Sequence, residues 1–328
     1  MTDRTDPHGS PSASPTHQGP DPEGKAMTQP MPASEPAVSA PQPSVREAGG
    51  AFAHIGYVLR SNPMTMIAFV LFVVIVIAAF LGPFIAPYDP LQSDVSAALQ
   101  PPSAQHWFGT DDLGRDVFSR VLVATGLDLV IAVSAVALSF ALGSVLGALS
   151  GYYGGWTDRI AGRFIDTIMA FPLFVLAMGI VAALGNSVVN IVYATAIVNL
   201  PFYARVSRAE VNVRREAGFV LAAKLSGNSD LRILATQIFP NALPPMMVQI
   251  SLNLGWAILN AAGLSFIGLG VSPPTPEWGI MVAEGARFIV SGEWWLALFP
   301  GAALMIAVFT FNMLGDGLRD IVDPRQRT

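Results

Sequence analysis

Long stretches without a charged residue alternate with short polar segments along this chain. The uncharged stretches cover residues 65–86, 129–157, 167–204, 233–276 and 294–315. A helix needs about 20 apolar residues to cross the roughly 30 Å hydrocarbon core of a bilayer, and one charge at its centre costs about 2.5–3.5 kcal/mol. The pattern therefore predicts six membrane-spanning helices, at residues 64–86, 122–150, 163–184, 187–207, 244–267 and 294–315.

The composition agrees with a membrane protein. The 328 residues are 52% hydrophobic and only 12% charged, with a mean hydropathy of +0.51. Soluble domains carry about twice that share of charged residues. The expected fold class is therefore all-α and polytopic. The chain has no cysteine, which excludes disulfides and thiolate metal sites, and its four histidines lack the spacing of metal ligands.

Residues 1–50 differ from the rest of the chain. They are rich in Pro, Ser and Gln, and such a segment cannot bury enough apolar surface to offset the entropy cost of ordering. The segment also lacks the basic start and short apolar core of a cleavable signal peptide. It is expected to be a disordered cytoplasmic tail, with the first spanning helix as the targeting signal.

Basic residues indicate which side of the membrane each connecting segment faces. With both termini in the cytoplasm, the inner segments hold thirteen Arg and Lys residues. The outer segments then hold three, Arg115, Arg120 and Arg287, leaving aside Arg4 and Lys25 in the tail. Because cytoplasmic segments carry the excess of positive charge in membrane proteins, the sequence predicts that both termini are cytoplasmic.

Candidate chemistry inside the expected spans is limited to uncharged polar groups. Asn199, Asn253, Asn260 and Asn312 lie within them. Asparagine contacts between membrane helices are worth about 0.6 kcal/mol, so these residues are interpreted first as links between helices and second as the lining of a hydrated path. A carrier coupled to protons or sodium normally has Asp, Glu or His at mid-span. None is expected there, which argues against such a carrier.

The sequence also lacks a nucleotide-binding motif. No glycine-rich loop ends in Lys-Ser or Lys-Thr, the pattern that cradles phosphates in P-loop proteins. If nucleotide energy drives this protein, another chain supplies it. We therefore expect no cofactor bound by this chain, and the sequence indicates no nucleic-acid partner.

The connection at residues 207–243 is the longest cytoplasmic segment after the tail. Residues 216–225 can form one helix, which Gly227 ends by taking a positive φ. A second helix can follow from Asp230, whose acid then lies at the positive end of that helix. The spacing predicts a helix–turn–helix.

The second of these helices is expected to be amphipathic. Leu231, Leu234 and Ile238 recur at helical spacing on one face. A helix with one apolar face suits the surface of a membrane. The segment is therefore expected to lie along that surface, with an apolar underside and an exposed turn.

The same segment resembles the cytoplasmic loop of permeases of binding-protein-dependent ABC importers. That loop has Glu-Ala-Ala, three residues, Gly, and about ten residues later Ile-Leu-Pro. The sequence here is LAAKLSGNSDLRILATQIFPN, and the matching positions are Ala222, Ala223, Gly227, Ile238 and Pro240. Phe239 replaces the leucine, and Leu221 stands where the family has glutamate.

Three further stretches of sequence restrict the resemblance to one class of permease subunit. HWFGTDDLGRDVFSR (106–120), GLSFIGLGVSPPTPEWG (263–279) and DGLRDIVDPR (316–325) resemble the second permease subunit of dipeptide, oligopeptide and nickel importers. The matches extend from about residue 65 to residue 325. One departure is GLDLV (126–130), where relatives usually carry a basic residue followed by serine.

The resemblance implies the architecture of a type I ABC importer permease with six transmembrane helices. Residues 1–50 would be the tail, and residues 51–121 an N-terminal segment with the first transmembrane helix and an extracytoplasmic loop. Residues 122–328 would be the permease core, with five transmembrane helices and an ATPase-docking loop at 207–243.

The resemblance also implies partners in the inner membrane and on both sides of it. These are a homologous second permease subunit, two cytoplasmic ATPase subunits that bind ATP and Mg, and an extracytoplasmic substrate-binding protein. Ala222, Ala223, Gly227 and Asp230 are the docking residues that it indicates. The cargo it favours is a di- or oligopeptide, with nickel or another small solute as the alternative.

Two other classes stay open. A secondary carrier would keep transporting after ATP depletion. A membrane scaffold that kept the fold without transport is the other class, and Leu221 is its only support in the sequence.

Overall fold

The structure is a computed structural model that describes residues 63–322. The predicted tail at 1–50 lies outside these residues. Regular structure in the described part is helical apart from one isolated bridge between Thr110 and Asp116. The elements are α2 (Pro63–Ile85), η1 (Val95–Ala97), α3 (Val117–Tyr153), α4 (Gly155–Met169), α5 (Leu173–Leu184), α6 (Val188–Arg214), α7 (Gly218–Leu225), α8 (Asp230–Ile233), η2 (Leu234–Ile238), α9 (Phe239–Phe266), α10 (Trp278–Ala286) and α11 (Trp295–Val322).

Length and composition alone do not confirm the predicted number of six spanning helices. Among residues 63–322, four helices are long and apolar enough to cross a membrane: α2, α3, the continuous helix Asp230–Phe266, and Trp295–Arg319 within α11. The pair of α4 and α5 makes a fifth if it forms one span. The length of α6 is sufficient, but its asparagine, tyrosine and arginine side chains lower its hydropathy.

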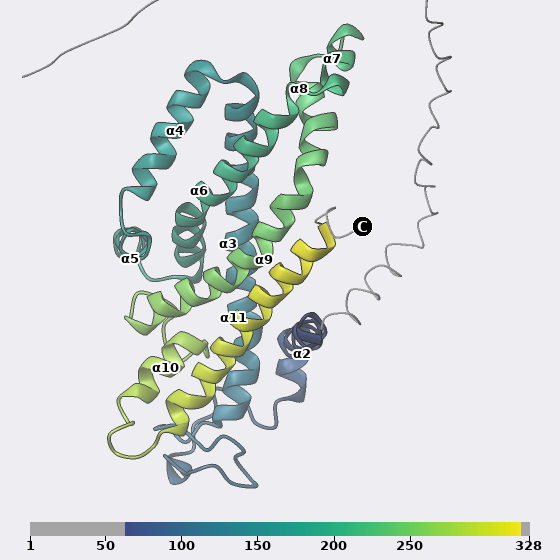
Figure 1. Cartoon of the computed structure of the whole chain (residues 1–328). Coiled ribbons are helices and arrows are strands. Elements are labelled where there is room, and N and C mark those ends of the chain that lie inside the picture. The colour runs from purple at the N-terminus through teal and green to yellow at the C-terminus, as the bar shows by residue number, and fades with distance from the viewer. Residues whose placement is uncertain (1–62, 323–328) are drawn as a thin grey trace, which may run out of the picture. The chain divides into compact units, whose positions relative to one another are not determined.

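The prediction of a single helix at residues 163–184 is wrong. The chain instead forms α4 and α5, which are bent by 88° relative to each other. Pro172 lies at the break and precedes the first residue of α5. Proline has no N–H to donate to the preceding turn, and its ring clashes with a helix that continues through it. The two halves therefore lie in different directions (Figure 1).

Close packing of α3 on α6 depends on small residues. Gly143, Gly147 and Gly151 recur every fourth residue on the face of α3 that meets α6. A Cβ added at these glycines would lie 2.2–2.6 Å from backbone oxygens of α6. Membrane helices use such small residues to bring two backbones together. This face fixes α6 in the interior, where it also packs on α5 and α9.

Tryptophan side chains hold together the end of the bundle opposite to α7 and α8. The indole of Trp278 donates to the carbonyl of Val121 on α3 at 3.1 Å. The indole of Trp295 donates to the carbonyl of Thr110 at 3.3 Å. The short helix α10 begins at Trp278, shortly after Pro273, Pro274 and Pro276. In Figure 1, α10 lies at the end of the bundle opposite to α7 and α8.

Candidate functional site

The segment from α7 through Gly227 to α8 is called the elbow here. Gly227 has a φ of +78°, as the sequence predicts. Its N–H donates to the carbonyl of Lys224 at 3.0 Å, and the N–H of Asn228 donates to the carbonyl of Ala223 at 3.2 Å. These two bonds form the Schellman motif that ends helices at glycine. The first helix is shorter than expected, because it begins at Gly218.

The underside of the elbow packs on α3 and α6. Val220 and Ala223 of α7 are buried together with Ile233, and they contact Tyr152 and Val211 in one apolar cluster. The predicted apolar face is therefore present, but the residues that form it differ from those predicted.

Leu231 does not belong to that face. Its side chain is 62% exposed, while Ile233, Leu234 and Ile238 are buried. In the preceding turn, Asp230–Ile233, Ile233 is the buried residue, and the π-helical segment Leu234–Ile238 begins only after it. The prediction for Leu231 is therefore wrong, whereas Leu234 and Ile238 lie where the spacing places them.

The second arm of the elbow is not a separate surface helix. The helix is continuous from Asp230 to Phe266 through α8, η2 and α9. The expected helix–turn–helix lying along the membrane is therefore wrong for this arm. Pro240, Pro244 and Pro245 lie inside the continuous helix without ending it, and the π-turn that precedes them is one means by which a helix tolerates such irregularity.

A polar network joins the elbow to the end of α3. The hydroxyl of Tyr152 donates to Oδ1 of Asp230 at 2.6 Å. Lys224 Nζ lies 3.7 Å from the same oxygen and 5.4 Å from the centre of the Tyr152 ring. Both arms of the elbow and α3 thus meet at one carboxylate, which fixes the angle between α7 and α8.

The outward surface of the elbow carries exposed leucines. Leu221, Leu225 and Leu231 are 60%, 82% and 62% exposed, and they are called the elbow patch. Ala222 is also exposed, whereas Ala223 is buried. Contiguous exposed apolar side chains on a surface indicate a protein or membrane contact. Of the four predicted docking residues, Ala222 is therefore placed for contact, Gly227 and Asp230 shape the turn, and Ala223 packs inside.

Comparison with known proteins identifies the family of this chain. Residues 143–328 match the family described as "Binding-protein-dependent transport system inner membrane component". Residues 53–102 match the family described as "N-terminal TM domain of oligopeptide transport permease C".

Three relatives extend the match over most of the chain. A probable D,D-dipeptide transport system permease of Escherichia coli (strain K12) is 42% identical over 295 residues, 90% of this chain and 98% of the relative. A dipeptide transport system permease of Alkalihalophilus pseudofirmus is 42% identical over 270 residues, 82% of this chain and 88% of the relative. A glutathione transport system permease of Escherichia coli O1:K1 / APEC is 42% identical over 267 residues, 81% and 88% respectively.

This chain belongs to the family of binding-protein-dependent transport permeases. The permease is thus a non-catalytic, multi-pass subunit of the inner membrane within an ABC importer. The family suggested by the elbow sequence and by the three further stretches is confirmed.

The permease encloses most of the asparagines that were predicted to line a path. Asn260 of α9 donates from Nδ2 to Oγ1 of Thr195 on α6 at 3.0 Å. Oδ1 of Asn253 accepts from Gln249, and Asn199 is fully buried. Asn312 is half-buried. The link between α6 and α9 at Asn260 fits the interpretation as a contact between helices, and a path-lining role for these residues stays a prediction.

A buried pair of carboxyl groups was missed by sequence reasoning. Asp128 lies within α3 and is 3% exposed, and Glu277 before α10 is 0% exposed. The two carboxyl groups interact with each other in these buried surroundings. The expectation of spans without an ionisable residue is therefore wrong at Asp128. The unusual sequence GLDLV was the available signal, but only the fold brings its acid beside Glu277.

Backbone groups complete the surroundings of this pair. The N–H of Trp278 donates to Asp128 Oδ2 at 3.1 Å. The N–H groups of Gly279 and Ile280 donate to the two oxygens of Glu277 at 3.0 and 2.8 Å, which caps α10. Burial raises the pKa of Glu277. No basic side chain pairs with either carboxyl among the residues that the structure describes.

Proposed function

We propose that this permease forms, with a homologous second permease subunit, the membrane path of an ATP-driven importer of peptides. Two cytoplasmic ATPase subunits would bind the elbow, and an extracytoplasmic binding protein would deliver the solute to the outer loops. The named relatives transport D,D-dipeptides, dipeptides and glutathione, which supports a small peptide as cargo. Nickel or another small solute remains the alternative substrate.

The observation that carries this proposal is the position of the elbow patch. Its exposed leucines lie on the outward surface, while the buried side of the elbow is fixed to α3 and α6. A second protein can therefore bind the patch without displacing the packing beneath it. ATP and Mg would be held by the ATPase subunits, whose closure and hydrolysis supply the energy.

The contacts of the elbow would transmit a displacement of the ATPase subunits to the membrane helices. A push on α8 passes into α9, because Asp230–Phe266 is one helix. It also passes into α3 through the bond between Asp230 and Tyr152. Both helices belong to the same bundle, so a movement of the ATPase subunits would rock α3 and α9 together and open the path on one side.

Six spans are the organisation that best accommodates this role. They are α2, α3, the bent pair α4–α5, α6, the helix ending in α9, and α11. α3, α5 and α9 surround much of α6, so neighbouring helices shield the polar groups that lower its hydropathy. Six spans would put both termini on the side of the elbow, and the excess of basic residues supports a cytoplasmic location for that side.

Substitution of Gly227 tests the docking role. No atom lies within 4 Å of a Cβ added at Gly227, so only its φ of +78° limits substitution. A β-branched residue is strongly disfavoured there, whereas asparagine adopts this conformation readily. Gly227→Val is expected to insert normally but to co-purify poorly with the ATPase subunits and to transport little. Gly227→Asn is the matched control and is expected to keep both properties.

Two results would contradict the proposal. Recovery of the ATPase subunits and uptake at the parental level in Gly227→Val would show that the elbow is not the docking element. Uptake of labelled dipeptide that persists after ATP depletion would show a secondary carrier. Competition of that uptake by glutathione or by a nickel chelate distinguishes the candidate substrates.

A further inference from the structure

A hollow of about 760 Å³ lies between α4 and α6, at the end of the bundle that carries the elbow. Four arginines and two aspartates line it together with Trp156 and two isoleucines. The hollow is therefore positively charged overall. Its size is in the range of sites that hold small ligands.

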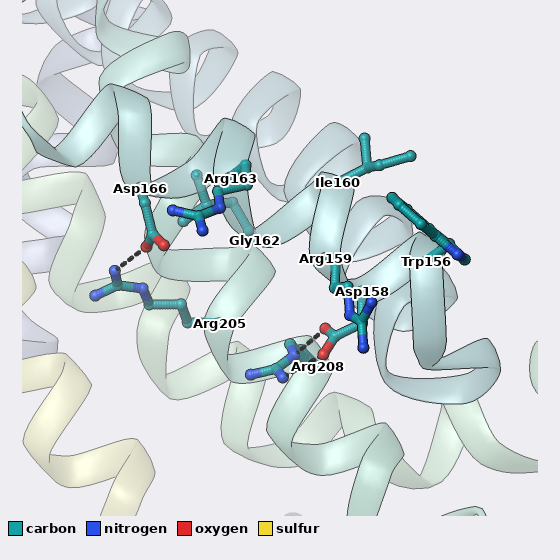
Figure 2. Close-up of a pocket in the computed structure, with 10 residues that line it drawn as sticks. Trp156, Asp158, Arg159, Ile160, Gly162, Arg163, Asp166, Arg205 and Arg208 are labelled. Atoms are coloured by element: carbon teal, nitrogen blue, oxygen red, sulfur yellow. Dashed lines mark hydrogen bonds and ion pairs between the residues drawn. The ribbon is translucent and has the colours of Figure 1, made fainter.

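The two aspartates are already paired with arginines of α6. Arg208 Nη2 donates to Oδ2 of Asp158 at 2.6 Å. Arg205 Nη2 donates to Oδ1 of Asp166 at 3.3 Å. Figure 2 shows these two ion pairs crossing from α4 to α6 on the two sides of the hollow. The two aspartates thus connect α4 to α6, and the positive charges of the two remaining arginines are not neutralised by them.

Those remaining arginines, Arg159 and Arg163, are exposed and four residues apart on α4. Neither forms an ion pair with any residue that the structure describes. Arg159 lies over the ring of Trp156, with its Cζ 5.6 Å from the ring centre. Gly162 lies between the two arginines, and a Cβ added there would meet no atom within 4 Å. The lining of the hollow at Gly162 therefore has room for a larger side chain or a ligand.

An apolar stripe follows the same helix. Trp156, Ile160 and Phe164 are exposed and recur at intervals of four residues, so they lie on one face of α4. The opposite side of α4 packs on α6 through Ile165. The free arginines border the apolar stripe, so charged and apolar side chains of α4 meet on one exposed surface.

The position of the hollow along α6 agrees with that interface. Residues 188–204 of α6 carry no charge, and Arg205 is the first charged residue after them. The hollow thus lies where the apolar part of α6 gives way to its charged part. Phospholipid phosphates are found at this depth.

We propose that this hollow binds the headgroup of an anionic phospholipid. The phosphate would lie in the hollow, where the guanidinium groups of Arg159 and Arg163 are free to pair with its oxygens. The acyl chains would run along Trp156, Ile160 and Phe164. Basic pockets between membrane helices bind anionic headgroups in this way. The proposal rests on the membrane location of the permease and does not depend on docking of the ATPase subunits.

The test uses the assembled transporter in detergent, titrated with short-chain phosphatidylglycerol, with bound lipid counted by native mass spectrometry. Arg159→Gln with Arg163→Gln is expected to weaken binding about 30-fold, since each arginine contributes about 1 kcal/mol at a membrane surface. Gly162→Leu fills the open space without changing the charge and is expected to reduce binding as well. Arg287→Gln with Arg319→Gln removes the same charge elsewhere and is the control.

Three further comparisons identify the ligand. Phosphatidylcholine is expected to bind more weakly than phosphatidylglycerol, and inorganic phosphate is expected not to displace the lipid, because it lacks acyl chains. Equal binding of phosphatidylglycerol by the parent and by both sets of pocket variants would overturn the proposal, as would displacement by inorganic phosphate. Cross-linking of Arg163→Cys to the second permease subunit would show a protein contact in place of the lipid. Co-purification of the ATPase subunits, measured on the same samples, reports separately on docking.

Discussion

The hydroxyl of Tyr152, the last residue but one of α3, donates a 2.6 Å hydrogen bond to the carboxylate of Asp230, the first residue of α8. The two residues are 78 positions apart in the sequence. Their contact joins the end of one spanning helix to the beginning of the helix that continues into α9. The elbow is therefore connected to two helices of the bundle at a single point.

Removal of the tyrosine hydroxyl should loosen this connection. Tyr152→Phe keeps the ring beside Lys224 but leaves Asp230 without its donor. A hydrogen bond to a charged group contributes about 1.5–3 kcal/mol when buried, and the half-exposed Asp230 places the loss below that range. We expect ATPase subunits to bind normally while more ATP is hydrolysed per peptide transported.

The ratio of hydrolysis to uptake in reconstituted vesicles measures this coupling. Tyr153→Phe is the matched control, because Tyr153 is adjacent and half-exposed and its hydroxyl has no hydrogen-bond partner among the described residues. An unchanged ratio in Tyr152→Phe would show that the bond to Asp230 does not transmit movement.

Leu221→Glu tests the chemistry of the elbow patch. Leu221 is 60% exposed, so the change should leave the fold of the permease intact. Together with Leu225 and Leu231 it predicts an apolar groove on the ATPase subunit. A carboxylate buried there without a partner costs about 1–3 kcal/mol, which corresponds to an affinity about 5- to 150-fold lower.

Titration of purified ATPase subunits onto the reconstituted permease measures that affinity. Val213→Glu, at another exposed apolar position near the end of α6, is the control and should bind as the parent does. Equal or tighter binding by Leu221→Glu would indicate that the partner still presents a basic groove for the acid of the family.

The Asp128–Glu277 pair makes stability depend on pH. Burial raises the pKa of Glu277 in the folded protein, so the folded state holds its proton more tightly than the unfolded state. The contribution of Glu277 to stability is therefore fully present below the ordinary carboxyl range, and it is lost as pH rises from that range through the raised pKa.

Asp128→Asn should reduce this loss without abolishing it, because burial, the main cause of the raised pKa of Glu277, is unchanged. The new amide donates to Glu277 without needing a proton, and its oxygen still accepts from the N–H of Trp278. The variant is expected to have a higher melting temperature than the parent at about pH 8 and a similar one at about pH 5. Each kcal/mol gained in the free energy of unfolding raises the melting temperature by about 2–4 °C.

Thermal unfolding of the purified complex across this pH range is the measurement. Asp112→Asn changes an exposed acid in the segment between α2 and α3. Its melting temperature should depend on pH as that of the parent does. If the melting temperature of Asp128→Asn changes with pH as much as that of the parent, the pair does not control the pH dependence of stability.

Local chemistry made several features predictable from the sequence. A bilayer excludes charge, so uncharged stretches of about 20 residues indicate membrane helices wherever they occur. Glycine adopts a positive φ with less strain than any other residue, so the turn at Gly227 could be predicted from its neighbours. The elbow sequence also sufficed to indicate the family, because its residues lie close together in the chain.

The tertiary structure decided the features that depend on distant contacts. Periodicity marks an apolar face, but packing of the elbow on α3 and α6 buries Ile233 and leaves Leu231 exposed. Hydropathy marks residues 163–184 as one apolar stretch, but Pro172 divides it into two helices bent by 88°. The partner of Asp128 is also set by packing, because Glu277 lies on another segment of the chain and reaches it only when α10 folds against α3.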